Sequence, residues 1–295
     1  MSKTSSAADA REKARQLAAQ QAKKSAKSST RWIQFTVLGV IALIIAIVAV
    51  VVINGNRNKI PEAGPVPTSA NQYGGIVLTK DGIVQGASAE ESRDSQDLGK
   101  SEATYTSIDG KETAMPLGVA LPDQAKDNGQ PVRLTIFQDF DCVHCADFES
   151  THGDEIQQLV DSGKITLEIR NLTFLDAHSP TYYSSRANNA AYSVANQVSA
   201  DKYLDFQREI FSHQGTGGLS NEELVDIASK YGADVKDDVA NNTWRPFINT
   251  VTLESASNGI SGTPTIFADG DLYNATSADF SQWINQKITD KKISE

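Results

Sequence analysis

The sequence predicts an α/β fold in which a strand–helix–strand unit is followed by a long helical segment. Residues 132–137 alternate and are rich in β-branched and aromatic side chains, which favours a strand. Residues 146–160 repeat apolar side chains at helical spacing, and residues 164–170 form a second β-rich run. A strand, a helix and a strand at this spacing are typical of a βαβ unit. Residues 180–257 then predict helices, and residues 265–268 predict a later short strand.

The N-terminal tail differs in charge from the rest of the chain. Residues 1–31 carry eight Lys and Arg against Asp9 and Glu12, a sum of +6. The whole chain has a formal net charge of −10, so residues 32–295 sum to −16. The acidic body argues against nucleic acid as a partner. A nucleic-acid arm is one interpretation of the tail, but its position beside an apolar run favours a membrane topology signal.

That apolar run predicts a transmembrane helix. Residues 35–53 are nineteen residues without charge, extended by Trp32 and Ile33, and a helix of about 20 residues crosses a bilayer. A cleavable signal peptide has a shorter apolar region and a small-residue cleavage site. We therefore predict an uncleaved signal anchor over residues 32–54. Because Lys and Arg crowd its N-terminal flank, we expect a cytoplasmic N-terminus and an extracytoplasmic body, where disulfides persist.

Local patterns predict the other elements. Residues 55–72 hold three prolines among Gly, Asn and Ser, which predicts a linker. Residues 75–84 predict a β-hairpin, because an Asp-Gly pair separates two β-prone runs. Residues 86–104 are polar and acidic and predict a surface loop. The helices expected after the βαβ unit cover residues 180–198, 200–213, 220–231, 235–257 and 277–288.

Apolar and aromatic side chains in these helices are candidates for the core. The expected members are Phe148, Ile156, Leu159, Val160, Trp244 and Phe247. Tyr182 and Tyr183 have two interpretations, either core residues or the lining of a groove beside the cysteine pair described next.

Cys142 and Cys145 are the only cysteines in the chain. A disulfide between residues this close closes a very small loop, and stabilisation by a disulfide grows with loop length. A metal site would need two more ligands nearby, and His152, His178 and His213 have no His or Cys three or four residues on. The spacing therefore predicts a redox-active pair that alternates between dithiol and disulfide.

The position of the pair suits thiol–disulfide exchange. Cys142 lies where a strand passes into a helix, so unpaired N–H groups and the helix dipole favour its thiolate. Cys145 lies about one turn further on and suits resolution of a mixed disulfide. His144 adds a hydrogen bond or, when charged, attracts the thiolate. One pKa unit of thiolate stabilisation corresponds to at most about 30 mV, so His144 favours an oxidant over a reductant.

Two motifs carry a family resemblance. Residues 137–145, Phe-Gln-Asp-Phe-Asp-Cys-Val-His-Cys, resemble the active site of the DsbA-like branch of the thioredoxin superfamily. Gly262-Thr263-Pro264-Thr265 is similar to the cis-proline loop of that family. The resemblance covers roughly residues 130–290 and implies a thioredoxin-like α/β fold with a helical insertion over about residues 177–258. The anchor and the hairpin resemble membrane-tethered members of Gram-positive bacteria, actinobacteria especially.

The resemblance also implies an activity. It implies a protein thiol–disulfide oxidoreductase, with Cys142, Cys145, His144, Thr263 and Pro264 as site residues. A cis bond before Pro264 would leave the Thr263 backbone free to pair with an extended substrate segment. The expected substrates are unfolded exported proteins with cysteines, and the expected reoxidant is a quinone-linked membrane protein of the DsbB or VKOR type. Neither a metal nor an organic cofactor is expected.

The sequence departs from the family pattern at two positions. Val143 replaces the usual proline between the cysteines. Ile136 stands six residues before the first cysteine, where many thioredoxin-fold proteins have a buried carboxylate for proton transfer. Asp139, Asp141, Glu149 or water are the candidates to replace it. For Asp139 and Asp141 the simpler interpretation is a solvated surface position.

These observations predict a division of the chain and leave rival functions open. The predicted parts are a tail (1–31), an anchor (32–54), a linker (55–72), an extension with a hairpin (73–130) and a thioredoxin-like domain (131–290). The same chemistry in reverse, a reductase or isomerase, is the first rival, although no dimerisation module precedes the domain. A tethered chaperone-like binding module is the second rival.

Overall fold

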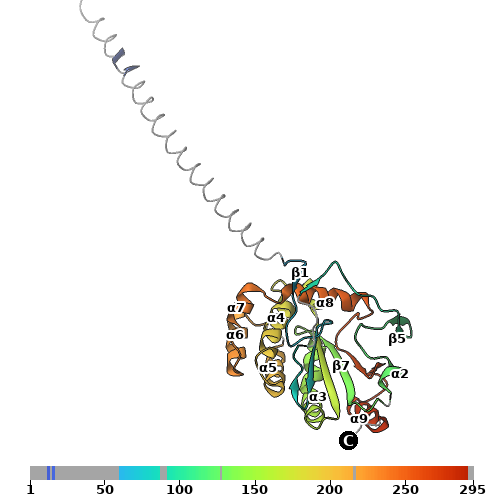
Figure 1. Cartoon of the computed structure of the whole chain (residues 1–295). Coiled ribbons are helices and arrows are strands. Elements are labelled where there is room, and N and C mark those ends of the chain that lie inside the picture. The colour runs from blue at the N-terminus through green and yellow to red at the C-terminus, as the bar shows by residue number, and fades with distance from the viewer. Residues whose placement is uncertain are drawn as a thin grey trace, which may run out of the picture. The chain divides into compact units, whose positions relative to one another are not determined.

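A mixed β-sheet forms the centre of the folded part of the chain (Figure 1). The structure is a computed structural model that describes residues 12–13, 15–16, 60–86, 92–126, 128–214 and 217–291. Within these residues the strand order is β10–β9–β7–β8–β2–β3, and only β7 and β8 are parallel. The strands are β2 (Gly75–Thr79), β3 (Gly82–Ile83), β7 (Val132–Gln138), β8 (Ile165–Asn171), β9 (Thr265–Ala268) and β10 (Asp271–Leu272).

The predicted anchor at residues 32–54 lies outside the described residues, as does most of the predicted tail. None of the helices in the described part of the chain has the length and apolar composition that crossing a bilayer requires.

The predicted βαβ unit and the predicted hairpin are both confirmed. Helix α3 (Val143–Asp161) joins β7 to β8, and β2 pairs with β3 around the Asp-Gly turn. The helix begins three residues earlier than the apolar pattern indicates, because Cys142 has extended dihedral angles and caps it. It ends before Gly163, whose φ of +67° is the left-handed conformation that commonly follows a helix.

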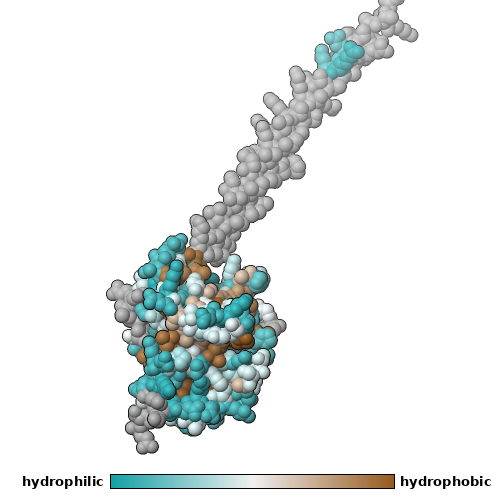
Figure 2. Space-filling model, turned by 90° about the vertical axis from the view of Figure 1, so that its right-hand side faces the viewer, coloured by the Kyte–Doolittle hydropathy of each residue, from teal (hydrophilic) through white to brown (hydrophobic). Residues whose placement is uncertain are grey.

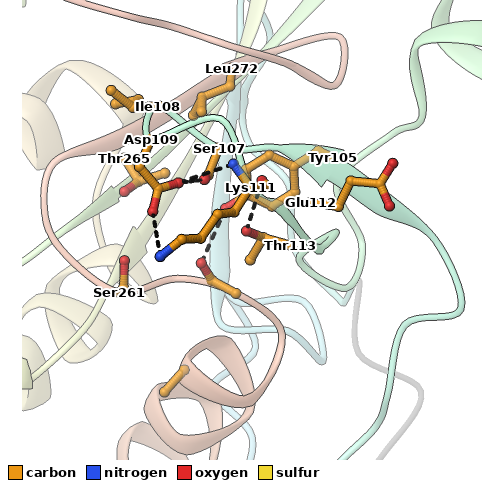
Figure 3. A pocket seen from close by; sticks show the side chains of 12 residues that line it. Tyr105, Ser107, Ile108, Asp109, Lys111, Glu112, Thr113, Ser261, Thr265 and Leu272 are labelled. Atoms are coloured by element: carbon orange, nitrogen blue, oxygen red, sulfur yellow. Dashed lines mark hydrogen bonds and ion pairs between the residues drawn. The ribbon is translucent and has the colours of Figure 1, made fainter.

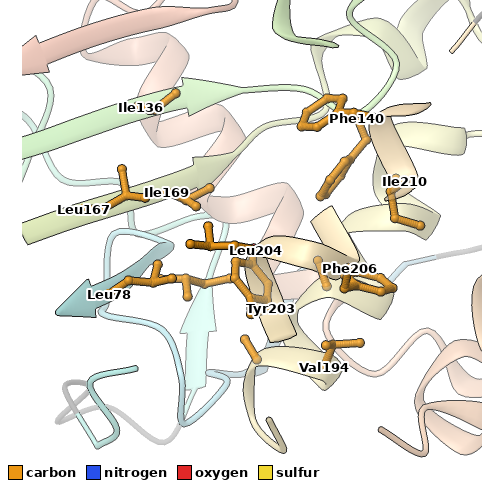
Figure 4. Packing of buried hydrophobic residues seen from close by; sticks show 14 of the residues in the cluster. Leu78, Ile136, Phe140, Leu167, Ile169, Val194, Tyr203, Leu204, Phe206 and Ile210 are labelled. Carbon is orange, nitrogen blue, oxygen red and sulfur yellow. The ribbon is translucent and has the colours of Figure 1, made fainter. Parts of the chain in front are cut away.

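Helices cover one face of the sheet. Alternate strand residues point toward this face, among them Ile136, Leu167 and Ile169, and α5 packs Leu204 and Ile210 onto the same core (Figure 4). The insertion lies on this side of the sheet (Figure 1). It contains the 3-10 helix η1 (Phe174–His178), α4 (Tyr183–Ala195), α5 (Ala200–Ser212), α6 (Asn221–Lys230), α7 (Lys236–Asn241) and α8 (Arg245–Ser257).

Two helical predictions need adjustment. The helix predicted over residues 235–257 is wrong as one element, since Asn242 at φ 54° ends α7 and α8 starts anew at Arg245. The last helix, α9 (Phe280–Asp290), begins three residues later than predicted. Asp279 sets that start, because its carboxylate accepts the Gln282 N–H at 3.1 Å.

The outer segment, which precedes β7, packs in two places. Its residues 63–65 and 92–94 pack against α8, whereas Met115 and Val119 cluster with Phe137 and Phe267 on the face of the sheet opposite the helices. This segment contains β1 (Ala63–Pro65), β4 (Ser92–Asp94), β5 (Thr104–Thr106), β6 (Glu112–Ala114) and the short helix α2 (Pro122–Ala125). The linker predicted over residues 55–72 is wrong in its second half, because β1 pairs with β4 and Ala70 is fully buried. The loop predicted over residues 86–104 is likewise interrupted by β4. The extension and the predicted domain therefore share one sheet, through β2 and β8.

A buried carboxylate joins this outer segment to the sheet. Glu168 on β8 has no exposed surface, and its oxygens accept hydrogen bonds from Arg133 Nε, Arg170 Nε and Asn71 Nδ2, each at 2.8 Å. Burial by itself would raise the pKa of Glu168, but the charges of Arg170 and Arg133 hold that pKa below its usual range. Arg170 also donates to the Leu117 carbonyl at 2.5 Å.

We expect Glu168→Gln to destabilise the fold by about 3–5 kcal/mol, because it leaves two arginines beside a neutral side chain. Urea unfolding of the full-length chain measures this loss. Lys230→Gln is the control, since it removes an ion pair with Glu209 from an exposed lysine and should cost less than about 1 kcal/mol. An equal loss in both variants would contradict a central role for Glu168.

Candidate active site around a buried cysteine pair

The two cysteines lie at the junction of β7 and α3. A tight turn connects them to the strand, with the Cys142 N–H donating to the Asp139 carbonyl at 3.0 Å. Cys142 caps α3 and Cys145 lies in its first turn. Both are free thiols, and their side chains are 7% and 2% exposed. Only the edge of Cys142 is therefore open to a reactant.

Thr263 and Pro264 lie beside this junction, as the family resemblance implied. The Thr263–Pro264 peptide bond is cis. The Cys142 thiol donates to the Thr263 carbonyl, with Sγ and O 3.3 Å apart. The loop precedes β9, and β9 pairs directly with β7, so the sheet brings residues 121 positions apart into contact.

The surroundings of Cys142 favour its thiolate. A hydrogen bond from the Cys145 thiol contributes most to lowering its pKa, and burial opposes this effect. Further hydrogen bonds come from the Thr263 side chain and from the backbone N–H groups of Cys145 and His144. Together they lower the pKa of Cys142 to about 5, so the thiol is largely ionised at neutral pH.

The surroundings of Cys145, by contrast, favour its protonated thiol. Burial raises its pKa far above the ordinary range of a thiol, and the neighbouring Cys142 raises it further. The pair therefore contains one reactive thiolate and one protonated thiol that serves as its hydrogen-bond donor.

His144 and Val143 are both exposed on the first turn of α3, and Val143 is 55% exposed. His144 acts on the Cys142 sulfur through its backbone N–H. The role expected of its imidazole stays a prediction. The exposed valine lies next to Cys142 and adds apolar surface at the rim of the site.

Asp139 is not a surface residue, which corrects the simpler interpretation of that position. Its side chain is fully buried, and its carboxylate accepts hydrogen bonds from Ser184 Oγ at 2.6 Å, the Asp141 N–H at 2.9 Å and the Leu175 N–H at 3.0 Å. Burial raises its pKa to about 6, although those three donors favour the charged form. Asp141 itself is half-buried. Asp139 is thus a buried carboxyl group within the cysteine loop.

A second buried carboxyl group, Glu149, lies one turn after Cys145 on α3. Burial raises its pKa, and Arg208 and Gln207 oppose the rise. Gln207 Nε2 donates to Glu149 at 3.4 Å, and Gln207 Oε1 accepts from Gln138 at 2.8 Å. The sequence indicated Glu149 as a candidate carboxylate but did not predict the hydrogen-bonded chain of Gln138, Gln207 and Glu149, because its members come from three separate elements.

The remaining candidates occupy core or surface positions. Ile136 and Phe247 are buried, while Trp244 is half-buried. Tyr183 is buried, and the Asp141 charge adds to the rise that burial causes in its pKa, so this tyrosine lies near the cysteine loop. Tyr182 is 54% exposed.

A pair of substitutions at Cys145 tests the origin of the low pKa. In the reduced wild type, thiolate absorbance at 240 nm should titrate with a midpoint of about 5. Cys145→Ser keeps a hydroxyl donor and should leave the midpoint nearly unchanged, whereas Cys145→Ala removes the donor and should raise it by roughly one unit or more. The same midpoint in the wild type and Cys145→Ala would assign the low pKa to the Thr263 side chain and the backbone N–H groups instead.

Comparison with known proteins places the site in a family. The sequence profile of the family described as Thioredoxin matches residues 127–286. A comparison with curated proteins gives no match.

Among solved structures, the reduced DsbA of Mycobacterium tuberculosis is 24% identical, with 60% of this chain and 90% of that chain covered and a TM-score of 0.48. The reduced DsbG of the same organism is 25% identical, with 59% and 89% covered and a TM-score of 0.49. The thiol-disulfide oxidoreductase MdbA of Actinomyces oris is 23% identical, with 66% and 97% covered and a TM-score of 0.47. The family profile spans both cysteines, the helical insertion and the Thr263–Pro264 loop, and it covers more than half of the 295 residues, so the chain belongs to the thioredoxin family.

Proposed function

We propose that this protein is a membrane-anchored, extracytoplasmic thiol–disulfide oxidoreductase that introduces disulfides into exported proteins. The supporting observation is the contrast within the cysteine pair: Cys142 has a pKa of about 5 and contacts Thr263, while the pKa of Cys145 is raised. A thiol with a low pKa is a good leaving group in disulfide exchange.

The proposed reaction has two steps. A substrate thiolate attacks Sγ of Cys142 in the oxidised enzyme, the Cys142–Cys145 bond breaks, and Cys145 leaves and takes up a proton. A second thiolate of the same substrate then attacks the substrate sulfur of the mixed disulfide, and Cys142 leaves as a thiolate. The substrate loses two electrons and two thiol protons and gains a disulfide, and the enzyme pair is reduced. Attack by Cys145 on Cys142 reverses the first step.

The low pKa of Cys142 favours the oxidising direction. A stabilised thiolate stabilises the reduced enzyme, which makes its disulfide a stronger oxidant. The pKa of about 5 lies about two units below neutral pH, which corresponds to a shift of at most about 60 mV toward oxidising potentials.

Thr263 provides the proposed contact with the substrate backbone. The Thr263 carbonyl oxygen lies 3.3 Å from Cys142 Sγ and accepts a hydrogen bond from it only while Cys142 is protonated. In the mixed disulfide Cys142 has no proton to donate, so the carbonyl is free to accept an N–H from an extended substrate segment. Pro264 has no N–H and donates no competing hydrogen bond from the loop.

The location and reoxidation of the enzyme complete the proposal. Residues 1–31 would lie in the cytoplasm, residues 32–54 would cross the membrane, and the folded part would lie outside. A membrane protein that passes electrons to quinone, of the DsbB or VKOR type, would reoxidise the cysteine pair.

The redox equilibrium of the full-length chain with glutathione, in detergent and read by thiol alkylation, tests the direction of exchange. We expect a potential well above that of glutathione and a reduced form that resists denaturant better than the oxidised form. Cys142→Ser should abolish exchange. A potential near that of thioredoxin, about −270 mV, would indicate a reductase instead. Retained client binding without any exchange by the wild type would indicate a chaperone-like module.

Anchoring is tested separately, by fractionation and by protease access from outside the cell. We expect the full-length chain in the membrane fraction with its folded part digestible from outside. Removal of residues 1–54 should move the protein to the soluble fraction. Recovery of the intact chain as a soluble protein would exclude the anchor.

A further inference from the structure

A pocket of about 580 Å³ lies next to the loop that carries Thr263. Ser261 and Thr265, which are two residues before and two residues after Thr263, both line it. The β5–β6 hairpin of the outer segment forms the opposite wall (Figure 3). A pocket of this size accommodates one or a few side chains.

The β5–β6 hairpin contacts residues on both sides of the loop that carries Thr263. Tyr105 donates its hydroxyl to the Gly259 carbonyl at 3.1 Å, and its ring packs edge-on against Phe267 at 5.1 Å. Gly259 has a φ of +92°, and a Cβ there would collide with the carbonyl oxygen of Ala114 on β6. The two walls are therefore in close contact at the base of the pocket, which gives the pocket a defined shape.

One end of the pocket is lined by two apolar side chains. Ile108, in the turn between β5 and β6, is 62% exposed, and Figure 3 draws it beside Leu272 at one end of the pocket. The face that carries β5 is otherwise largely hydrophilic, with separate hydrophobic areas (Figure 2). Asp109 and Lys111 pair with each other at 3.5 Å, so neither of these two side chains offers an uncompensated charge to a ligand. An apolar side chain is the ligand that this end of the pocket favours.

We propose that this pocket selects substrates by accepting an apolar side chain two residues away from the reacting cysteine. The inference rests on the proposed function, since it takes the substrate segment to pair with the loop at Thr263 while its cysteine is bonded to Cys142. In such pairing, substrate residues two positions from the one opposite Thr263 lie opposite Ser261 and Thr265, about 7 Å away along the strand. Ile108 and Leu272 then act as specificity-determining residues.

Two reduced peptides test this inference with the oxidised full-length chain in detergent. They are identical except at the position two residues from a cysteine, where one has Leu and the other has Ala. We expect the wild type to prefer the Leu peptide by about tenfold in kcat/KM, mainly through KM. Ile108→Ser should reduce the preference to about twofold or less. Val84→Ser, a similar change at a 37% exposed valine following the β3 edge strand, should keep the tenfold preference.

Glutathione as a third reductant separates the two proposals. Reduction of the enzyme by glutathione and by both peptides without a preference, or an unchanged preference in Ile108→Ser, would overturn the pocket inference and leave the proposed function standing. Failure of all three thiols to reduce the disulfide would overturn both. Thermal unfolding of Ile108→Ser equal to that of the wild type would show that a lost preference comes from the pocket.

Discussion

The buried carboxylate of Glu168 is the constraint on which the arrangement of the outer layer depends. An ionised carboxylate without solvent contact is very unfavourable unless its hydrogen bonds are satisfied. Its donors come from β7, from β8 and from Asn71, so the first residues of the folded part are held against the sheet. The Arg170 contact with Leu117 then holds the chain that follows the β5–β6 hairpin. The wall of the pocket beside Thr263 depends in turn on that placement.

The same sheet also positions the cysteine pair. Because β9 lies next to β7, the loop before β9 and the loop after β7 meet at one edge, and Thr263 contacts Cys142. The core beneath them buries Cys145 and keeps it protonated, which makes it a donor to the Cys142 thiolate. The contrast in pKa therefore arises mainly from the burial of one sulfur beside the other.

Local sequence patterns were sufficient to predict the elements whose structure depends mainly on their own residues. The alternation at 132–137, the Asp-Gly hairpin and the C-x-H-C motif each describe a structure within ten residues or so, and the structure agrees with them. The predictions that were wrong concern contacts between residues far apart in the sequence. β1 and β4 are three-residue strands without apolar alternation, and only their contact with each other defines them. Asp139 is polar and looks solvent-exposed in sequence, but Ser184 from the insertion covers it.

The cysteine content of the chain has a consequence for its own maturation. The reactive pair accounts for both cysteines, so no further disulfide is available to stabilise the scaffold. Stability must come from the core, from the buried ion pairs and from the hydrogen bonds between layers. A protein that supplies disulfides to others under this proposal therefore needs none to fold. Under the proposed function, the folding of its first copies would therefore not depend on disulfides made by other copies.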